Sequence, residues 1–470
     1  MGAPGRWTVL AVCCLSLFIS TLDITIVNVA LPSIRDSLHA SLSGLQWTVD
    51  AYTLVLAILL MLSGSLGDRL GRRRVFRAGL ALFSLGSLLC SVAPALGWLV
   101  AFRGLQAVGG SMLNPVALAI IVTAFPDRQE RARAIGVWGA VVGVSMALGP
   151  VLGGVLVDSI GWRSIFWVNV PVGLAALALT GRHVPESRAA HTRELDLPGQ
   201  ALVILVLGAL TYAIIEAPAH GWGSGETLGV LALAGLAVAA LLVVERRRRQ
   251  PLIELRFFRS VPFSAATVTA VAAFAALGTF LFVNTLYPQN VRGLSPIEAG
   301  LWTLPMAAAG GLCAPLSGRL VAARGARLPM VLAGAATAAG ALLLVDVQPH
   351  TAEGRLLAAY VLIGIGFGLV NAPITNTATS GMPREQAGVA AAIASTSRQI
   401  GSVLGVAVSG SLLAGRSGTA FTTGEHAVWI MVTGCGVAVV LLGLAGTSGR
   451  AQATARRAHE TMTTQETAAV

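Results

Sequence analysis

The sequence predicts an all-α polytopic membrane protein with fourteen transmembrane helices. Of its 470 residues, 55% are hydrophobic and 11% are charged, whereas soluble domains carry roughly 25% charged residues. Apolar segments recur along the chain, and most are close to the roughly 20 residues that a helix needs to cross a bilayer. In so apolar a chain, the net charge of +11 indicates membrane orientation rather than a nucleic-acid partner.

The expected helices follow one another along the chain with short polar loops between them. The first covers residues 8–30, which is too long for a signal-peptide core, so we expect it to remain as a membrane helix. The other thirteen cover residues 45–66, 75–95, 98–121, 134–157, 164–181, 198–217, 227–244, 262–285, 297–317, 328–346, 355–378, 388–412 and 427–446.

The distribution of arginine sets the expected orientation. An even number of helices places both termini on one side, and if that side is the cytoplasm, 25 arginines lie inside, five outside and two within helices. Positive residues concentrate in cytoplasmic loops. We therefore expect a multi-pass protein in the lipid bilayer of the cell (cytoplasmic) membrane, with both termini cytoplasmic.

An internal repeat predicts the domain organisation. The basic hairpin at residues 64–74 recurs in degenerate form at residues 317–327, where Ala322 replaces Asp68. The repeat indicates an N-terminal six-helix bundle at residues 1–185 and a C-terminal six-helix bundle at 260–447. Residues 186–259 would hold two inserted helices with flanking cytoplasmic loops, and the Ala/Thr/Gln-rich residues 448–470 a disordered cytoplasmic tail.

Several motifs occur at matching helix positions: Leu22 to Pro32, Gly64 to Arg74, Arg103 to Gly109, Gly149 to Gly154, Trp162 to Gly173 and Ser397 to Gly401. Together they resemble the major facilitator superfamily, and more closely its fourteen-helix drug:proton antiporter branch, the EmrB/QacA-type multidrug exporters. The resemblance implies the major facilitator fold. It also implies export of lipophilic or amphipathic compounds by alternating access, driven by the proton gradient without ATP or another cofactor.

The first hairpin is the candidate gating loop, formed by Gly64, Gly67, Asp68, Arg69, Gly71, Arg72 and Arg73. The resemblance implies a cytoplasmic latch in which Asp68 caps a neighbouring helix and pairs with arginine. The alternative is an ordinary positive-inside loop, which explains the arginines but not the aspartate or the glycine spacing.

The fifth helix carries a candidate antiporter motif, formed by Gly143, Gly149, Pro150, Gly153 and Gly154. Glycines at such spacings allow close helix contact, and proline can bend the axis. The resemblance associates this motif with exporters; generic packing is the alternative in a chain with 54 glycines.

Three ionisable groups are expected at one depth. Asp23, Asp50 and Arg103 each lie about 22 Å above the inner face at 1.5 Å per residue. One arginine cannot neutralise two carboxylates, so one carboxylate is left to exchange a proton. We expect Asp23 to be the structural or gating partner and Asp50 to titrate. The alternative places both near the outer interface, hydrated and merely hydrogen-bonded.

Polar and aromatic side chains within helices are candidates for a substrate cavity: Asn28, Trp47, Tyr52, Asn371 and Arg398, with Trp138 and Phe367 as further aromatic wall. Arg398 would meet an anionic substrate group, or only pin two helices together. Interhelical hydrogen bonding is the alternative for the asparagines.

Other functions are weighed against multidrug export. A dedicated exporter of one endogenous metabolite or self-made antibiotic has the same sequence features. A membrane-embedded enzyme would need a catalytic cluster, yet all seven histidines map to loops, helix ends or the tail. A passive channel is a further alternative, but the two-half repeat and the glycine-rich hinges argue against it. The five cysteines lack metal or disulfide spacing. We therefore expect a monomeric transporter of small molecules and protons, without enzymatic activity, metal or nucleic-acid partner.

Overall fold

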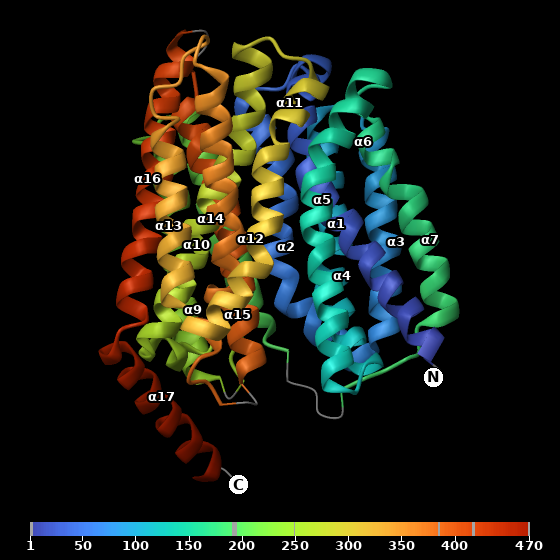
Figure 1. Cartoon of the computed structure of the whole chain (residues 1–470), viewed down its shortest axis with the longest axis vertical. Coiled ribbons are helices and arrows are strands. Elements are labelled where there is room, and N and C mark those ends of the chain that lie inside the picture. Colours follow the sequence, from blue (N-terminus) through green and yellow to red (C-terminus); the bar gives the residue numbers. More distant parts are fainter. Residues whose placement is uncertain (1–2, 190–194, 249, 384–385, 416–418, 469–470) are drawn as a thin grey trace. The chain divides into compact units, whose positions relative to one another are not determined.

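In the computed structural model, the described residues are helical over most of their length (Figure 1). The structure describes residues 3–189, 195–248, 250–383, 386–415 and 419–468. The chain forms two compact units, the first comprising Met1–Leu195 with Leu281–Leu304 and the second Asp196–Phe280 with Pro305–Val470. The predicted domain boundaries at 185, 259 and 447 remain a prediction.

The first unit contains the helices that follow the N-terminus. They are α1 (Ala3–Leu38), α2 (Leu42–Leu70), α3 (Arg72–Ser91), α4 (Leu96–Ala124), α5 (Arg128–Ser159), α6 (Ser164–Trp167), α7 (Asn169–His183), η2 (Tyr287–Val291) and α11 (Pro296–Trp302). Glycines bring α3 and α4 together, because a Cβ on Gly79 would lie 2.8 Å from the Met112 side chain and one on Gly86 2.6 Å from the Gln106 backbone. Such close approach is typical of packing between membrane helices.

The second unit begins with the inserted helix pair. Its helices are α8 (Leu197–His220), α9 (Gly225–Arg247), η1 (Leu255–Arg259), most of α10 (Val261–Leu286), α12 (Leu304–Arg324), α13 (Arg327–Leu342), α14 (Glu353–Thr379), α15 (Ala387–Leu413), α16 (Thr419–Gly446) and α17 (Gly449–Ala468). α13 packs between α14 and α16, while α8 packs against both α9 and α15.

The structure supports a polytopic membrane fold, but not the expected count of fourteen spans. Among the described residues, twelve helices are long and apolar enough to cross a membrane. The two other expected spans fall at α13 and α15. α13 has only 16 residues, about 24 Å at 1.5 Å per residue. α15 is long enough, but a polar run at residues 395–399 lowers its hydropathy.

The tail was expected to be disordered, and the structure places a helix there instead. α17 buries Ala451, Ala455, Ala458 and Met462, which recur at three- and four-residue intervals and so share one helix face. The Thr454 hydroxyl accepts a hydrogen bond from the backbone N–H of Val261 at 3.0 Å. The expectation of disorder rested on the composition of this segment, which does not reveal the spacing of its apolar residues.

Candidate functional site

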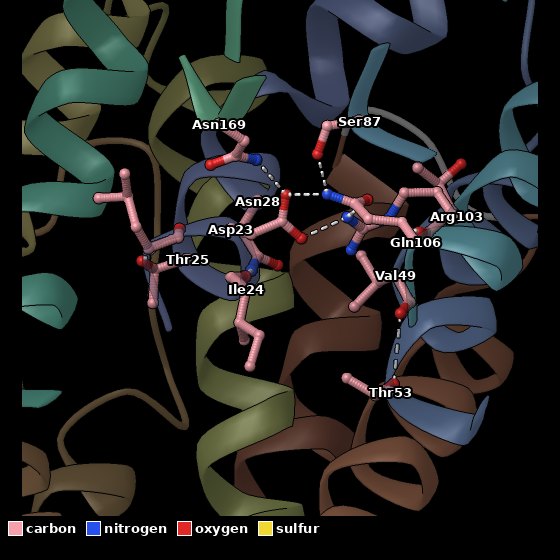
Figure 2. Close-up of polar contacts among 12 residues, drawn as sticks. Asp23, Ile24, Thr25, Asn28, Val49, Thr53, Ser87, Arg103, Gln106 and Asn169 are labelled. Carbon is pink, nitrogen blue, oxygen red and sulfur yellow. Dashed lines mark hydrogen bonds and ion pairs between the residues drawn. The ribbon is translucent and has the colours of Figure 1, made fainter. Parts of the chain in front are cut away.

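A buried ion pair between α1 and α4 is the centre of the candidate site (Figure 2). The Arg103 guanidinium contacts a carboxylate oxygen of Asp23 at 2.5 Å, and the two residues are only 1% and 0% exposed. The expected proximity of these two charges is therefore observed. At this burial each charge is costly without its partner.

Neutral side chains complete the hydrogen bonding of Asp23. The side-chain amides of Gln106 and Asn169 each donate to Asp23 Oδ1 at 2.8 Å, and Gln106 also donates to the Ser87 hydroxyl at 2.7 Å. In Figure 2 the amides of Gln106 and Asn169 lie beside the carboxylate, and Ser87 lies beyond Gln106. The two amides orient the carboxylate through hydrogen bonds. Because they carry no charge, the guanidinium of Arg103 is what neutralises it.

Arg103 is held on its other sides as well. Its Nη1 donates to the side-chain carbonyl of Gln106 at 2.7 Å, and its Nε donates to the backbone carbonyl of Thr48 at 3.2 Å. The guanidinium also lies 4.2 Å from the ring centroid of Tyr52, in a cation–π contact. Tyr52, expected in the substrate cavity, thus belongs to this buried cluster.

Asp50 stands apart from the ion pair. It is fully buried; its Oδ1 accepts a long 3.4 Å hydrogen bond from the Thr53 hydroxyl, and its Oδ2 has no hydrogen-bond partner in the described chain. Thr48 and Tyr52, four residues apart, share the α2 face that contacts Arg103. Since a helix turns about 100° per residue, Asp50 points away from that face.

The glycine-proline motif packs α5 tightly between two other helices. A Cβ on Gly149 would collide with the Thr25 hydroxyl of α1, and one on Gly153 would lie 2.9 Å from the Ile26 side chain. On another side, a Cβ on Gly154 would lie 2.5 Å from Ile297 of α11. Gly143 lies in the same helix, half-buried.

Pro150 is part of this contact too, because its carbonyl faces the Cα of Gly300 so closely that no side chain would fit there. The motif therefore provides closely packed surfaces toward both α1 and α11.

Within the gating loop, Asp68 and Arg72 form an ion pair. The Arg72 guanidinium donates to Asp68 Oδ1 at 2.8 Å and to the Thr123 hydroxyl of α4 at 2.7 Å. Gly67 allows α2 to approach α4, since a Cβ there would lie 2.9 Å from Val116, while Gly64 lies near Pro115. Arg69 lies in the last turn of α2. The predicted capping of a neighbouring helix by Asp68 stays a prediction.

Glu186, just after α7, holds the other side of the loop. Its carboxylate accepts from the backbone N–H of Arg73 at 3.1 Å and lies 3.7 Å from the Arg74 guanidinium. Arg73 also donates to the backbone carbonyl of Gly181. Gly71 adopts φ 112°, a conformation that favours glycine, and a Cβ there would lie 2.6 Å from the Glu186 carboxylate.

The remaining cavity candidates lie in different surroundings. In the first unit, the Asn28 amide donates to the Ile24 carbonyl at 2.7 Å, while its side-chain carbonyl is buried without a hydrogen-bond partner among the described residues. Trp47 is half-buried on α2.

In the second unit, Arg398 donates to the Thr375 hydroxyl at 2.6 Å and so joins α15 to α14. The Thr375 hydroxyl in turn donates to the backbone carbonyl of Asn371 at 3.2 Å. A small apolar cavity of this unit is lined by Ala273, Leu277, Ile363, Phe367, Val370 and Val439, among others. Arg398 thus has the helix-pinning contact that formed one of its two expected roles.

Within the described residues, no group of three or more His, Cys, Asp or Glu side chains is arranged to hold a metal ion.

Comparison with known proteins assigns the family. The model of the Major Facilitator Superfamily matches residues 13–406. The chain belongs to this superfamily. It is 42% identical to the multidrug resistance protein Stp of Mycobacterium tuberculosis, covering 85% of this chain and 74% of that protein. It is 39% identical to the tetracenomycin C resistance and export protein of Streptomyces glaucescens, covering 89% and 78%.

Solved structures agree with the superfamily fold. A bacterial homologue of the human lysosomal transporter Spinster, inward-facing and unoccupied, superposes with a TM-score of 0.63 at 19% identity, covering 98% of both chains. A bacterial homologue of the human drug peptide transporters gives a TM-score of 0.68 at 15% identity, covering 96% of this chain and 99% of that one. These likenesses concern the fold alone.

Sequence reasoning missed two members of the hydrogen-bond network around Asp23 and Arg103, and two acids elsewhere in this superfamily member. Gln106 and Asn169 lie inside the quoted motifs, and polar amides within apolar helices were the available signal. Glu186 was an isolated acid in a basic segment. Glu425 lay just before the expected start of the last span at residue 427; in the structure it lies within α16, fully buried.

Proposed function

We propose that this protein exports lipophilic or amphipathic drugs and antibiotics across the cytoplasmic membrane by antiport with protons, through alternating access. The names of its relatives support export of such compounds: one is named a multidrug resistance protein, and another a drug efflux pump, JefA, of Mycobacterium tuberculosis. The superfamily fold supports transport rather than catalysis.

One observation carries the proton coupling: two buried carboxylates lie in the first unit, and only one has a cationic partner among the described residues. Arg103 neutralises Asp23, whereas Asp50 has only the Thr53 hydroxyl beside it. An isolated buried carboxylate is far more stable when protonated. Asp50 is therefore the proton carrier, and Asp23 is the positioning partner that keeps Arg103 in place.

The proton step follows from this difference. With Asp50 buried, its carboxyl is neutral; exposure of the same group to water allows it to ionise and release the proton. A second proton site on Asp23 is unnecessary, because the Asp23–Arg103 pair has no net charge. Transport is then driven by the proton gradient, and the substrate is a small molecule.

We further propose that α13 and α15 also cross the membrane, which gives the fourteen-helix topology of the EmrB/QacA-type branch with both termini cytoplasmic. α13 packs against two apolar helices, α14 and α16, and α15 packs against α8, α14 and α16. Helices so enclosed can span the bilayer while being shorter or more polar than lipid-facing ones.

A narrower cargo is the second candidate. Three relatives are named for single antibiotics: tetracenomycin C, methylenomycin A and puromycin. This observation favours a dedicated exporter of one antibiotic. The two candidates share the same transport machinery and differ only in the range of substrates.

Fluorescent-dye efflux from cells expressing the chain tests the proposal. We expect efflux of several lipophilic dyes, abolished by a protonophore and at equal expression strongly reduced in Asp50→Asn. Thr53→Val is the matched control, since it removes only the neutral group beside Asp50. Protonophore-insensitive efflux would refute proton coupling, and efflux of a single antibiotic but no dye would support the narrower cargo.

A further inference from the structure

Two buried carboxylates meet at one end of the inserted helix pair. Asp196 precedes α8 and accepts a hydrogen bond from the backbone N–H of Gly199 at 2.9 Å through Oδ1. Glu245 lies in the last turn of α9 and accepts from the backbone N–H of Ile253 at 3.3 Å through Oε2. The two residues are 7% and 3% exposed. Each carboxylate therefore has one oxygen that accepts a hydrogen bond from a backbone N–H.

The other oxygen of each carboxylate points to the same place. Asp196 Oδ2 and Glu245 Oε1 both have no hydrogen-bond partner in the part of the chain that the structure describes. A Cβ built on Gly199 would lie 2.7 Å from each of these two oxygens, so they are separated by at most twice that distance. The absent side chain of Gly199 is what leaves room for them.

The surrounding charges neutralise only one of the two acids. The Arg248 guanidinium lies 3.6 Å from Asp196 Oδ1, but its side chain is 43% exposed and its attraction is screened. Arg246 and Arg247 are exposed. Glu254 adds a further acid nearby, but pairs with Arg256 at 3.0 Å.

The neighbouring helix adds little charge. α15, which packs against α8, carries Arg398 as its one charged residue, and Arg398 donates to Thr375 and Ser395. One negative charge would thus remain buried if both acids were ionised.

We propose that Asp196 and Glu245 hold one proton between them and form a proton-binding site on the inserted helix pair, additional to the carboxylates of the first unit. Two like charges this close do not both ionise readily, whereas a single shared proton lets the protonated carboxyl donate to the ionised one. The site also joins the start of α8 to the segment after α9, through Ile253.

The arginine distribution predicts that this end of the helix pair is cytoplasmic, so the site would respond to cytoplasmic pH. The folded protein binds the shared proton and the unfolded chain, near neutral pH, does not. Stability therefore falls as pH rises through the titration of the pair. This inference does not depend on drug export.

The unfolding temperature of the purified full-length protein, followed from about pH 5.5 to about pH 8.5, tests the inference. We expect the midpoint of the wild type to fall with rising pH, and Glu245→Gln to lose at least half of that fall. Glu254→Gln is the matched control and should keep the wild-type slope. A wild-type slope in Glu245→Gln would overturn the inference.

Infrared difference spectra between the same two pH values provide a readout independent of stability. In an Asp50→Asn, Glu425→Gln background, which removes the other two buried acids that lack a cationic partner among the described residues, we expect the carbonyl stretch of a protonated carboxyl at low pH, and its loss when Glu245→Gln is added. An unchanged carbonyl stretch contradicts the shared proton. So does restoration of the high-pH midpoint by a millimolar metal cation, because that result would assign the site to a cation.

Discussion

Replacing Arg103 with leucine isolates the energetic role of the buried ion pair. The change removes the guanidinium at 2.5 Å from Asp23, its hydrogen bonds to Gln106 and Thr48, and its stacking on Tyr52. Breaking a buried pair from one side costs about 3–5 kcal/mol, because it leaves an uncompensated charge.

Thermal unfolding of the purified protein measures this loss. Arg103→Leu should unfold at a clearly lower temperature than the wild type. The double variant with Asp23→Asn should recover about 2 kcal/mol relative to the sum of the single losses. Additive losses, or an Arg103→Leu protein as stable as the wild type, would refute the role given to the pair.

Three further predictions concern the glycine motif and the gating loop. Gly149→Ala should cost about 1–3 kcal/mol by overpacking against α1, measured as a lower unfolding temperature, whereas Gly139→Ala, with open space around it, should not. Asp68→Asn should leave membrane insertion intact and reduce efflux about tenfold at equal expression, since a charge-assisted hydrogen bond is worth about 1.5 kcal/mol; undiminished efflux would contradict the latch. Gly71→Ala should destabilise more than Gly325→Ala, where only backbone strain of about 1–3 kcal/mol acts; equal losses would mean that the Glu186 contact is unimportant.

The helices could be predicted well from sequence because long apolar segments separated by polar loops mark them. Each of the fourteen expected segments overlaps a helix of the described chain. The ends of helices depend on tertiary contacts instead, and these were less predictable. α16 begins at Thr419 rather than near residue 427, and α17 forms where its alanines find a packed surface.

For the candidate site, the depth of each residue in the membrane could be predicted, but the direction of its side chain around the helix axis could not. Counting residues along α1 and α4 placed Asp23 and Arg103 at one level, and the structure joins them. The same count placed Asp50 there too, yet the direction of its side chain depends on which face of α2 packs against α4. The amides of Gln106 and Asn169 depend likewise on interhelical pairing, which no single helix reveals.

The loop prediction shows the same limit. The sequence pattern singled out Asp68 and the glycines, and the structure pairs Asp68 with Arg72 within the loop. Glu186 lies 113 residues from Arg73 in sequence, and only folding brings its carboxylate to that backbone N–H.

Proton movement in everted membrane vesicles tests the central claim, that Asp50 carries the coupling proton while Asp23 and Arg103 form a permanent neutral pair. A pH-sensitive dye in the vesicles would report substrate-induced proton efflux. We predict a clear signal for the wild type and for Thr53→Val, and none for Asp50→Asn even though substrate still binds. Normal substrate-induced proton movement in Asp50→Asn would contradict the account.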